Sequence, residues 1–327
     1  MKERSKKPVL GILGIIAFLL FLIPIGFYLS NPLILDEVSL LLIYGIFALS
    51  IDLLWGYMGI LSFGQAAFFG LGAYTMAWVT KGLYFANVSM LGILLGIMVP
   101  MAIGFVLSLS LFFSRIRGMY FTIITLAFAA IAENIAVAQP IFGGYDGLFD
   151  IPPIRVSLSK NLIGSFSGGL PYYYIVLSML FLVYMVCRRI VNSPLGMIFA
   201  SINFNEERAE SFGLNTAIPK TLAFTVAAGI AGFAGALYVP EAGLICYQDM
   251  GVVFSTQAVI WVALGGRGTL IGAIVGAILV KTLSYILSDI MATYWLGVLG
   301  LLFILCVTLF PEGIMGWALK RHRRRMS

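Results

Sequence analysis

The residues whose types and spacing most suggest a function form one charged segment, Asn205-Glu206-Glu207-Arg208-Ala209-Glu210-Ser211-Phe212-Gly213. Charged residues make up only 10% of the chain, against roughly 25% in a soluble domain. A short charged helix in such a chain either connects two membrane spans through water or binds another protein at the membrane surface. The residues alone leave both interpretations open.

The chemistry of helix ends divides this region into two short helices. Asn192-Ser193-Pro194 predicts one start, because Asn and Ser cap free N–H groups and proline is tolerated in the first turn. A second start is predicted at Asn203 or Asn205, where the following glutamates complement the positive end of the helix dipole. Gly213 suits the end of this helix, and Pro219 suits the opening of the next one.

Ionisable and amide side chains also lie inside apolar runs, namely Asp52, Glu133 with Asn134, and Lys281. Such groups are rare at membrane depth, and a functional role is the default expectation. We take Asp52, Glu133 and Asn134 as candidates for a substrate path. The alternative is an interhelical pair that fixes packing, for example Lys281 with a carboxylate.

Two neutral polar residues, Ser62 and Gln65, lie in an apolar run that glycines interrupt. Their side chains both donate and accept hydrogen bonds, and they do so without the desolvation cost of a charge. They suit the path of a small neutral polar solute. Equally, they suit hydrogen bonding between neighbouring membrane helices.

Several kinds of chemistry find no support in the sequence. The three cysteines fit no metal motif and predict no disulfide, and His322 in a basic tail is the single histidine. No HExxH motif, Ser/His pair or carboxylate cluster is present, and Gly265-Gly266-Arg267-Gly268 lacks the lysine of a P-loop. We therefore expect no catalytic residue, no metal site, no cofactor and no ATPase site. The net charge of +6 lies in short tails and loops, so it does not predict nucleic-acid binding.

The elements that position these residues are membrane helices. Apolar residues make up 61% of the chain, and a spanning helix needs roughly 20 of them in a row. The sequence predicts an all-α, polytopic membrane protein forming a single domain over 1–327, with 193–213 as a cytoplasmic segment within it. The predicted spans are 9–29, 37–56, 60–80, 89–113, 119–140, 171–191, 219–239, 254–265, 269–288 and 293–310. Glycines puncture the third span and the eighth is short, so either is a candidate half-helix or re-entrant piece.

Basic residues predict the topology, because short cytoplasmic loops are enriched in Lys and Arg. Such residues cluster before the first span, after the fourth, after the sixth and in the C-terminal tail, whereas loops 30–36 and 241–253 have none. Both termini and segment 193–213 are therefore predicted to be cytoplasmic, and loop 141–170 external. Small residues at four-residue spacing, in the rows Gly268, Gly272, Gly276 and Ala228, Gly232, Ala236, predict close helix packing.

Several motifs carry a family resemblance. Glu207-Arg208-Ala209-x-x-x-Gly213 resembles the Glu-Ala-Ala-x-x-x-Gly coupling motif of ABC importer permeases, with Arg in place of the second residue. The chain resembles the branched-chain amino acid and urea permease family over nearly its whole length. The motifs are Leu61 to Tyr74, Gly143-Gly144-Tyr145-Asp146-Gly147-Leu148, Leu237-Tyr238-Val239-Pro240, Val259 to Leu270 and Ile51 to Tyr57. Several of these look closest to the urea branch, whereas Phe204 and Lys281 depart from the usual pattern.

The resemblance implies a transport subunit of an ABC importer in a bacterial inner membrane. It implies as partners a second homologous permease, cytoplasmic ATPase subunits, an external substrate-binding protein and the lipid bilayer. It also implies that Asn205, Glu206, Glu207, Arg208, Ala209 and Gly213 couple the permease to the ATPase. The expected solute is urea or a short amide; the alternatives are a branched-chain amino acid or, with no ATPase, a secondary transporter or channel for a small polar solute.

Overall fold

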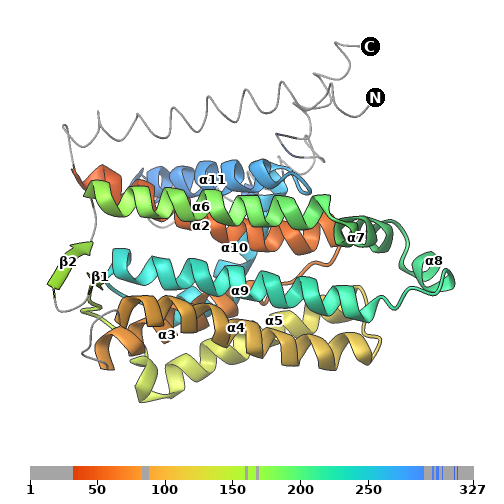
Figure 1. The fold of residues 1–327 in the computed structure, drawn as a ribbon, viewed down its shortest axis with the longest axis horizontal. Coiled ribbons are helices and arrows are strands. Elements are labelled where there is room, and N and C mark those ends of the chain that lie inside the picture. The colour runs from red at the N-terminus through yellow and green to blue at the C-terminus, as the bar shows by residue number, and fades with distance from the viewer. Residues whose placement is uncertain are drawn as a thin grey trace, which may run out of the picture.

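The computed structural model describes residues 32–82, 88–158, 161–166 and 169–290, together with a few isolated positions near the C-terminus. Within these residues the fold is helical, as the composition predicts, and the long helices run side by side in an elongated bundle (Figure 1). One end carries α7 (Pro194–Phe204) and α8 (Glu206–Ser211), and we call it the α8 end. The opposite end carries strands β1 (Ile154–Leu158) and β2 (Asn161–Phe166), and we call it the hairpin end.

The long helices correspond closely to the predicted apolar runs. They are α2 (Pro32–Asp52), α3 (Gln65–Gly82), α4 (Val88–Phe113), α5 (Met119–Ala138), α6 (Gly169–Asn192), α9 (Ala217–Ala242), α10 (Val252–Gly265) and α11 (Leu270–Ile290). A π-helix, η1 (Leu53–Tyr57), continues α2, and two short 3₁₀ helices are η2 (Pro140–Phe142) and η3 (Tyr247–Met250).

Six stretches of the described chain are long and apolar enough to cross a membrane. They are Ile34–Tyr57, Val88–Phe113, Met119–Ala138, Gly169–Asn192, Ala217–Ala242 and Leu270–Ile290. Neither α3 nor the 14-residue α10 is among them, which matches the doubt about the third and eighth predicted spans. The first predicted span, 9–29, lies outside the described residues, and the tenth, 293–310, does so almost entirely.

The third predicted span begins later than the sequence suggested, because residues 59–64 are not helical and α3 starts only at Gln65. Side chains from other helices satisfy the backbone of this break. Phe63 N donates to Thr125 Oγ1 at 3.2 Å, and Ala66 N donates to Ser255 Oγ at 3.1 Å. Irregular backbone at membrane depth is tolerated only where protein or a cavity surrounds it, and this break is enclosed by the bundle.

The hairpin end adds a feature that the all-α prediction did not include. Strands β1 and β2 pair antiparallel, with Ile154 opposite Phe166 and an irregularity between Val156 and Ser157. The preceding loop is also fixed to the bundle. Leu148 and Ile245 exchange two backbone hydrogen bonds, of 2.9 and 3.0 Å, which attach this loop to the chain that follows α9.

Small residues bring α3, α4 and α9 together, as the row containing Gly232 predicted. A Cβ built on Gly232 would lie 2.4 Å from Pro100 Cγ and 2.5 Å from the carbonyl oxygen of Gly96. A Cβ on Gly72 would lie 2.1 Å from the carbonyl oxygen of Gly232. Neither position has room for a side chain, so the helix-packing interpretation of this row is confirmed.

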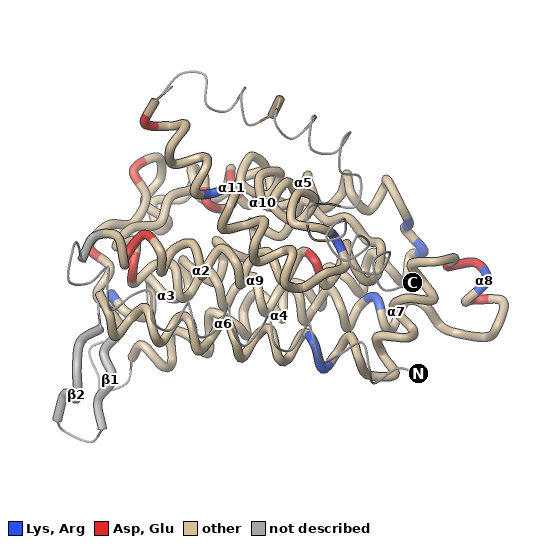
Figure 2. The backbone as a smooth tube through the Cα atoms, turned by 90° about the horizontal axis from the view of Figure 1, so that it is seen from above, with Lys and Arg blue, Asp and Glu red and all other residues tan. Residues whose placement is uncertain are grey.

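Most of the described Lys and Arg residues lie at the α8 end of the bundle (Figure 2), with Lys81 in the last turn of α3 as an exception. The ends of helices that meet at the α8 end carry Arg115, Arg117, Arg188, Arg189, Lys220 and Arg267. The hairpin end carries Asp36, Glu37, Asp146, Asp150 and Asp289. This asymmetry is the one that the positive-inside rule would produce if the α8 end faced the cytoplasm.

Candidate functional site

The candidate site is the charged segment at the α8 end, and local sequence sets its boundaries as predicted. Ser193 precedes Pro194, the first residue of α7, but its side chain does not cap that helix and donates instead to the carbonyl of Ile190 at 2.6 Å. Asn205 caps α8, because its side-chain oxygen accepts a hydrogen bond from the backbone N–H of Arg208 at 3.0 Å. This bond satisfies one of the N–H groups that every helix leaves free at its start.

Gly213 ends α8 in the manner that its residue type predicted. Its φ of +82° is left-handed, a conformation that L side chains rarely adopt. Gly213 N donates to the carbonyl of Glu210 at 2.8 Å, and Leu214 N donates to the carbonyl of Ala209 at 3.2 Å. These two bonds form a Schellman motif, which closes the helix and turns the chain back toward α9.

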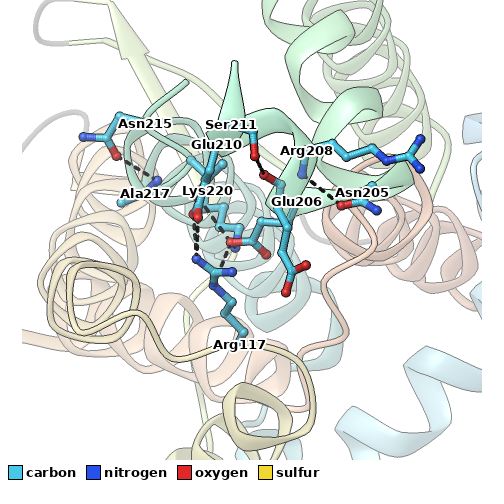
Figure 3. Close-up of polar contacts among 11 residues, drawn as sticks. Arg117, Asn205, Glu206, Arg208, Glu210, Ser211, Asn215, Ala217 and Lys220 are labelled. Carbon is cyan, nitrogen blue, oxygen red and sulfur yellow. Dashed lines mark hydrogen bonds and ion pairs between the residues drawn. The ribbon is translucent and has the colours of Figure 1, made fainter. Parts of the chain in front are cut away.

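One face of α8 holds the helix against the bundle (Figure 3). Glu206, Ala209 and Glu210 follow the three- and four-residue spacing of a single helix face, and Ala209 is buried. Glu206 forms ion pairs with Arg117, whose Nε lies 3.2 Å from Oε1, and with Lys220. Helix α8 is thereby attached both to the loop between α4 and α5 and to the first turns of α9.

Glu210 strengthens the same attachment. Nη2 of Arg117 lies 2.7 Å from each carboxylate oxygen of Glu210, and Thr216 Oγ1 donates to Oε1 of Glu210 at 2.8 Å. The hydrogen bond from Arg117 lowers the pKa of Glu210 below its usual value, and the same bond raises the pKa of Arg117. Both groups therefore stay charged near neutral pH. Lys220 is only 4% exposed, so its ammonium depends on Glu206 for compensation.

The other face of α8 points away from the bundle. Glu207 and Arg208 are exposed, and no ion pair of the described chain involves either of them. Large apolar side chains flank them, since Phe204 is 85% exposed and Phe212 is 87% exposed. Exposed aromatic rings beside charged residues are typical of a protein–protein contact surface. We call Phe204, Glu207, Arg208 and Phe212 the outer surface of α8.

Two cavities lie beneath the segment, with volumes of about 360 and 290 Å³. Phe112, Ile116, Arg117, Glu206 and Lys220 line both of them. The base of α8 is therefore held mainly by polar contacts, with the buried Ala209 as its apolar contact with the core. Such an attachment leaves room for the segment to shift relative to α4, α5 and α9.

Helix α7 also contacts the end of the first described span. Asn203 Nδ2 donates to the carbonyl of Tyr57 at 3.3 Å, at the end of the π-helix η1. At the start of η1, Asp52 is fully buried, and its Oδ1 accepts a hydrogen bond from Gly268 N at 2.7 Å. Asp52, predicted as part of a substrate path, here ties α2 to the turn between α10 and α11.

The remaining candidates for a substrate path each make their own local contacts. Ser62 Oγ accepts from Gly64 N at 3.3 Å, just before α3, and Gln65 begins that helix with only 1% of its surface exposed. Neither amide atom of Gln65 has a hydrogen-bond partner among the described residues. Glu133 accepts from Val252 N at 3.4 Å and so caps α10. Asn134 lies on the exposed face of α5, where its side chain bonds to Ala130 of its own helix.

Sequence reasoning missed the partners of the charged segment and the surroundings of Lys281. Arg117 and Lys220 entered only as topology signals, although opposite charges on both sides of the glutamates hinted at pairing. Lys281, for which a carboxylate partner was the alternative, lies over the ring of Tyr44, with its Nζ 4.3 Å from the ring centroid, and it interacts electrostatically with Asp249. No ion pair of the described chain includes Lys281.

Comparisons with known proteins place the chain in a family. The family described as branched-chain amino acid transport system / permease component matches residues 33–307. The chain belongs to this permease family. It is 29% identical to the high-affinity branched-chain amino acid transport system permease protein LivM of Escherichia coli over 324 residues, which cover 93% of this chain and 74% of that protein.

More distant relatives extend the comparison. The probable branched-chain amino acid transport permease protein LivM of Methanocaldococcus jannaschii is 25% identical over 86% of this chain and 94% of its own length. The autoinducer 2 import system permease protein LsrC of Salmonella typhi is 28% identical over 42% of this chain and 41% of its own length. No solved structure matches the chain. The prediction of an ABC permease of the branched-chain amino acid transport family is confirmed, whereas transport of urea is not shown.

Proposed function

We propose that this permease is the membrane-spanning subunit of an ATP-driven importer, and that the outer surface of α8 docks on a cytoplasmic ATPase. The observation that carries the proposal is the division of α8 into two faces. Glu206 and Glu210 are used to hold the helix on the bundle, whereas Glu207 and Arg208 remain available beside two exposed aromatic rings. A helix that only connected two spans would not need to expose Phe204 and Phe212 to water.

The ATPase belongs to a partner in this proposal, and the permease has no enzymatic activity of its own. The glycine-rich stretch 265–268 forms the turn between α10 and α11, where Gly268 N is already bonded to Asp52. Its geometry is that of a helix connection and lacks the strand–loop–helix setting of a nucleotide-binding loop. The full importer then contains ATPase subunits, an external binding protein and a second homologous permease.

The proposed orientation places the α8 end and both termini in the cytoplasm of a bacterium, with the permease in the inner membrane. The basic residues at the α8 end support this orientation. About ten membrane segments complete the proposal, namely six full spans, α3 and α10 as partial crossings, and the predicted spans 9–29 and 293–310, which lie wholly or almost wholly outside the described residues. Cysteine labelling at Tyr145, which is exposed at the hairpin end, and at Ser211 tests it; labelling of both positions from the same side would contradict it.

Branched-chain amino acids are the solutes that the relatives favour. The two LivM proteins, which cover most of this chain, are named for branched-chain amino acid transport. Urea or a short amide is a second candidate, and one observation favours it. Gln65 presents a buried, neutral amide with no described partner, which could exchange hydrogen bonds with a small neutral solute.

The docking proposal is tested by co-expression of the permease with its ATPase and by reconstitution of the full importer. We expect Glu207→Lys to weaken co-purification of the ATPase and to lower uptake, because it reverses the charge of the outer surface without removing any contact to the bundle. Glu37→Lys is the matched control, since Glu37 is also exposed but lies at the hairpin end. Full ATPase recovery and full uptake with Glu207→Lys would refute docking through this surface.

Uptake into vesicles that hold the reconstituted importer identifies the transported solute. ATP-dependent uptake of labelled leucine without uptake of urea supports the branched-chain assignment, and the reverse result supports urea. The Gln65→Leu variant tests whether Gln65 lines the solute path, which is a separate question from which solute is transported. We expect it to reduce uptake of a neutral amide solute; unchanged urea uptake in this variant would remove Gln65 from the path.

A further inference from the structure

Lys281 occupies an unusual position inside the bundle. It lies in the middle of α11, and its Nζ faces three aromatic rings from two other helices. The ring centroid of Tyr44 in α2 lies 4.3 Å away, and those of Phe254 and Trp261 in α10 each lie 5.6 Å away. The side chain is only partly buried, whereas all three aromatic residues are buried.

The rings stabilise the charge of Lys281 but do not satisfy its hydrogen bonding. An ammonium has three N–H donors, and aromatic faces attract a cation without accepting conventional hydrogen bonds. Within the described part of the chain, no carboxylate lies within ion-pair distance of Lys281. Asp249 interacts with Lys281 electrostatically but makes no ion pair with it, and a charge at this depth without an ion-pair partner is costly. The ammonium is therefore positioned to accept an anionic partner from outside the described chain.

The surroundings of Lys281 define what kind of anion would fit. Phe254 stacks on Phe47 with ring centroids 5.3 Å apart, and it packs edge-on against Phe69 at 5.3 Å. Phe47 and Phe69 are fully buried, so the rings around Lys281 belong to an apolar aromatic cluster in the core of the bundle. Asp249 in η3 interacts electrostatically with Lys281, and its Oδ2 accepts a hydrogen bond from Cys246 N. The neighbourhood thus offers a positive charge in apolar surroundings.

We propose that Lys281 binds the carboxylate of a zwitterionic amino acid as it crosses the bundle, beside the rings of Tyr44 and Phe254. This assignment rests on the proposed function, because it presupposes that the permease carries an amino acid. It goes further by naming the residue that distinguishes such a solute from a neutral one. Urea offers no carboxylate, and Lys281 would have no role in its recognition.

The test uses the full importer in vesicles, with the external binding protein saturated with leucine. Lys281→Met keeps an unbranched side chain but removes the charge, and we expect leucine uptake to fall by about tenfold or more, the loss of one charge-assisted contact. Lys281→Arg keeps the charge and should retain most of the uptake. Arg267→Met is the matched control, because Arg267 also lies over a ring, that of Trp55 at 5.9 Å, but is exposed at the α8 end.

Assembly and basal ATPase activity provide the readout that a packing role would change. We expect both to stay at the wild-type level in Lys281→Met while uptake falls. Leucine uptake within twofold of wild type would overturn the assignment. So would a loss of assembly shared by Lys281→Met and Lys281→Arg, which would show that Lys281 serves packing. A wild-type importer that moves urea and no leucine would instead refute the proposed substrate, and the carboxylate site with it.

Discussion

Replacing Glu206 by glutamine is the most direct test of how α8 is held on the bundle. Oε1 of Glu206 meets three groups at once, namely Arg117, Lys220 and the hydroxyl of Thr216 at 3.2 Å. Glutamine keeps the shape of the side chain but removes the negative charge. Lys220 would then keep an ammonium in a buried position without its one described ion pair, and only the weaker electrostatic interaction with Glu210 would remain.

The free-energy cost of Glu206→Gln depends on how deeply the Glu206–Lys220 ion pair is buried. Removing one partner of a fully buried ion pair costs about 3–5 kcal/mol, and a hydrogen bond to a charged group contributes about 1.5–3 kcal/mol. The Glu206 side chain is 21% exposed, so water recovers part of the loss, and we take about 2–3 kcal/mol. At about 1.4 kcal/mol per factor of ten, the population with α8 detached should rise by about 30- to 150-fold.

Hydrogen exchange of the purified permease measures this population. The amides of residues 206–214 should lose protection in Glu206→Gln, because they exchange when α8 leaves the bundle. Glu207→Gln is the matched control, since the same residue type one position along points away from the bundle and has no described ion pair. Its exchange should equal that of the wild type.

A double-mutant cycle decides whether Lys220 is the cause. Adding Lys220→Met to Glu206→Gln removes the uncompensated ammonium, so the double variant should be less destabilised than the sum of the two single changes. Equal protection in Glu206→Gln and Glu207→Gln would refute the two-face description of α8. Strictly additive effects would refute the direct coupling of Glu206 to Lys220.

Three further outcomes are expected. Gly213→Ala should loosen the end of α8 by about 1–2 kcal/mol, because a φ of +82° is strained for alanine, and protection of the α8 amides checks it. Gly232→Leu should sharply reduce the yield of folded permease, because a side chain there would overlap α4, whereas Gly82→Leu, with open space at its Cβ, should not; size-exclusion profiles distinguish them. Because Arg117 holds the pKa of Glu210 below its usual 4.5, the contribution of Glu210 to α8 protection should be constant above pH 4.5 and should be lost only as the pH falls below that value; exchange measured from pH 7 downward shows whether loosening begins earlier.

The parts of the fold that the sequence predicted are those that local chemistry sets. A run of about twenty apolar residues needs a helix in lipid whatever surrounds it, so most spans were placed within a few residues. Ser193, Asn205 and Gly213 act on their own neighbours, and the helix ends followed. The break before Gln65 was only suspected, because its backbone is satisfied by Thr125 and Ser255 from distant helices.

The contacts that complete the candidate site depend on which helices are neighbours. In lipid, an apolar pattern shows that a helix spans but not which helix it packs against. Arg117 reaches Glu210 across 93 positions of sequence, and no local signal identifies that pair. The same limit applied to Lys281, whose aromatic neighbours come from α2 and α10. The sequence indicated whether each of these residues lies in a span or in a loop, but not which residues it contacts.

Polar contacts link segment 193–213 to the interior of the bundle through the π-helix η1. Asn203 of α7 binds its last carbonyl, at Tyr57, and Asp52 at its start binds Gly268, two residues before α11 begins. π-helical turns are rare, and those that exist are often found at functional sites. Conversion of a π-helical turn to an α-helical turn would rotate the residues beyond it by about 100°. A shift of α7 imposed at the α8 end would therefore act on both attachments of η1. Under the proposed function, these contacts form one route from the ATPase docking surface to α11, the helix that carries Lys281.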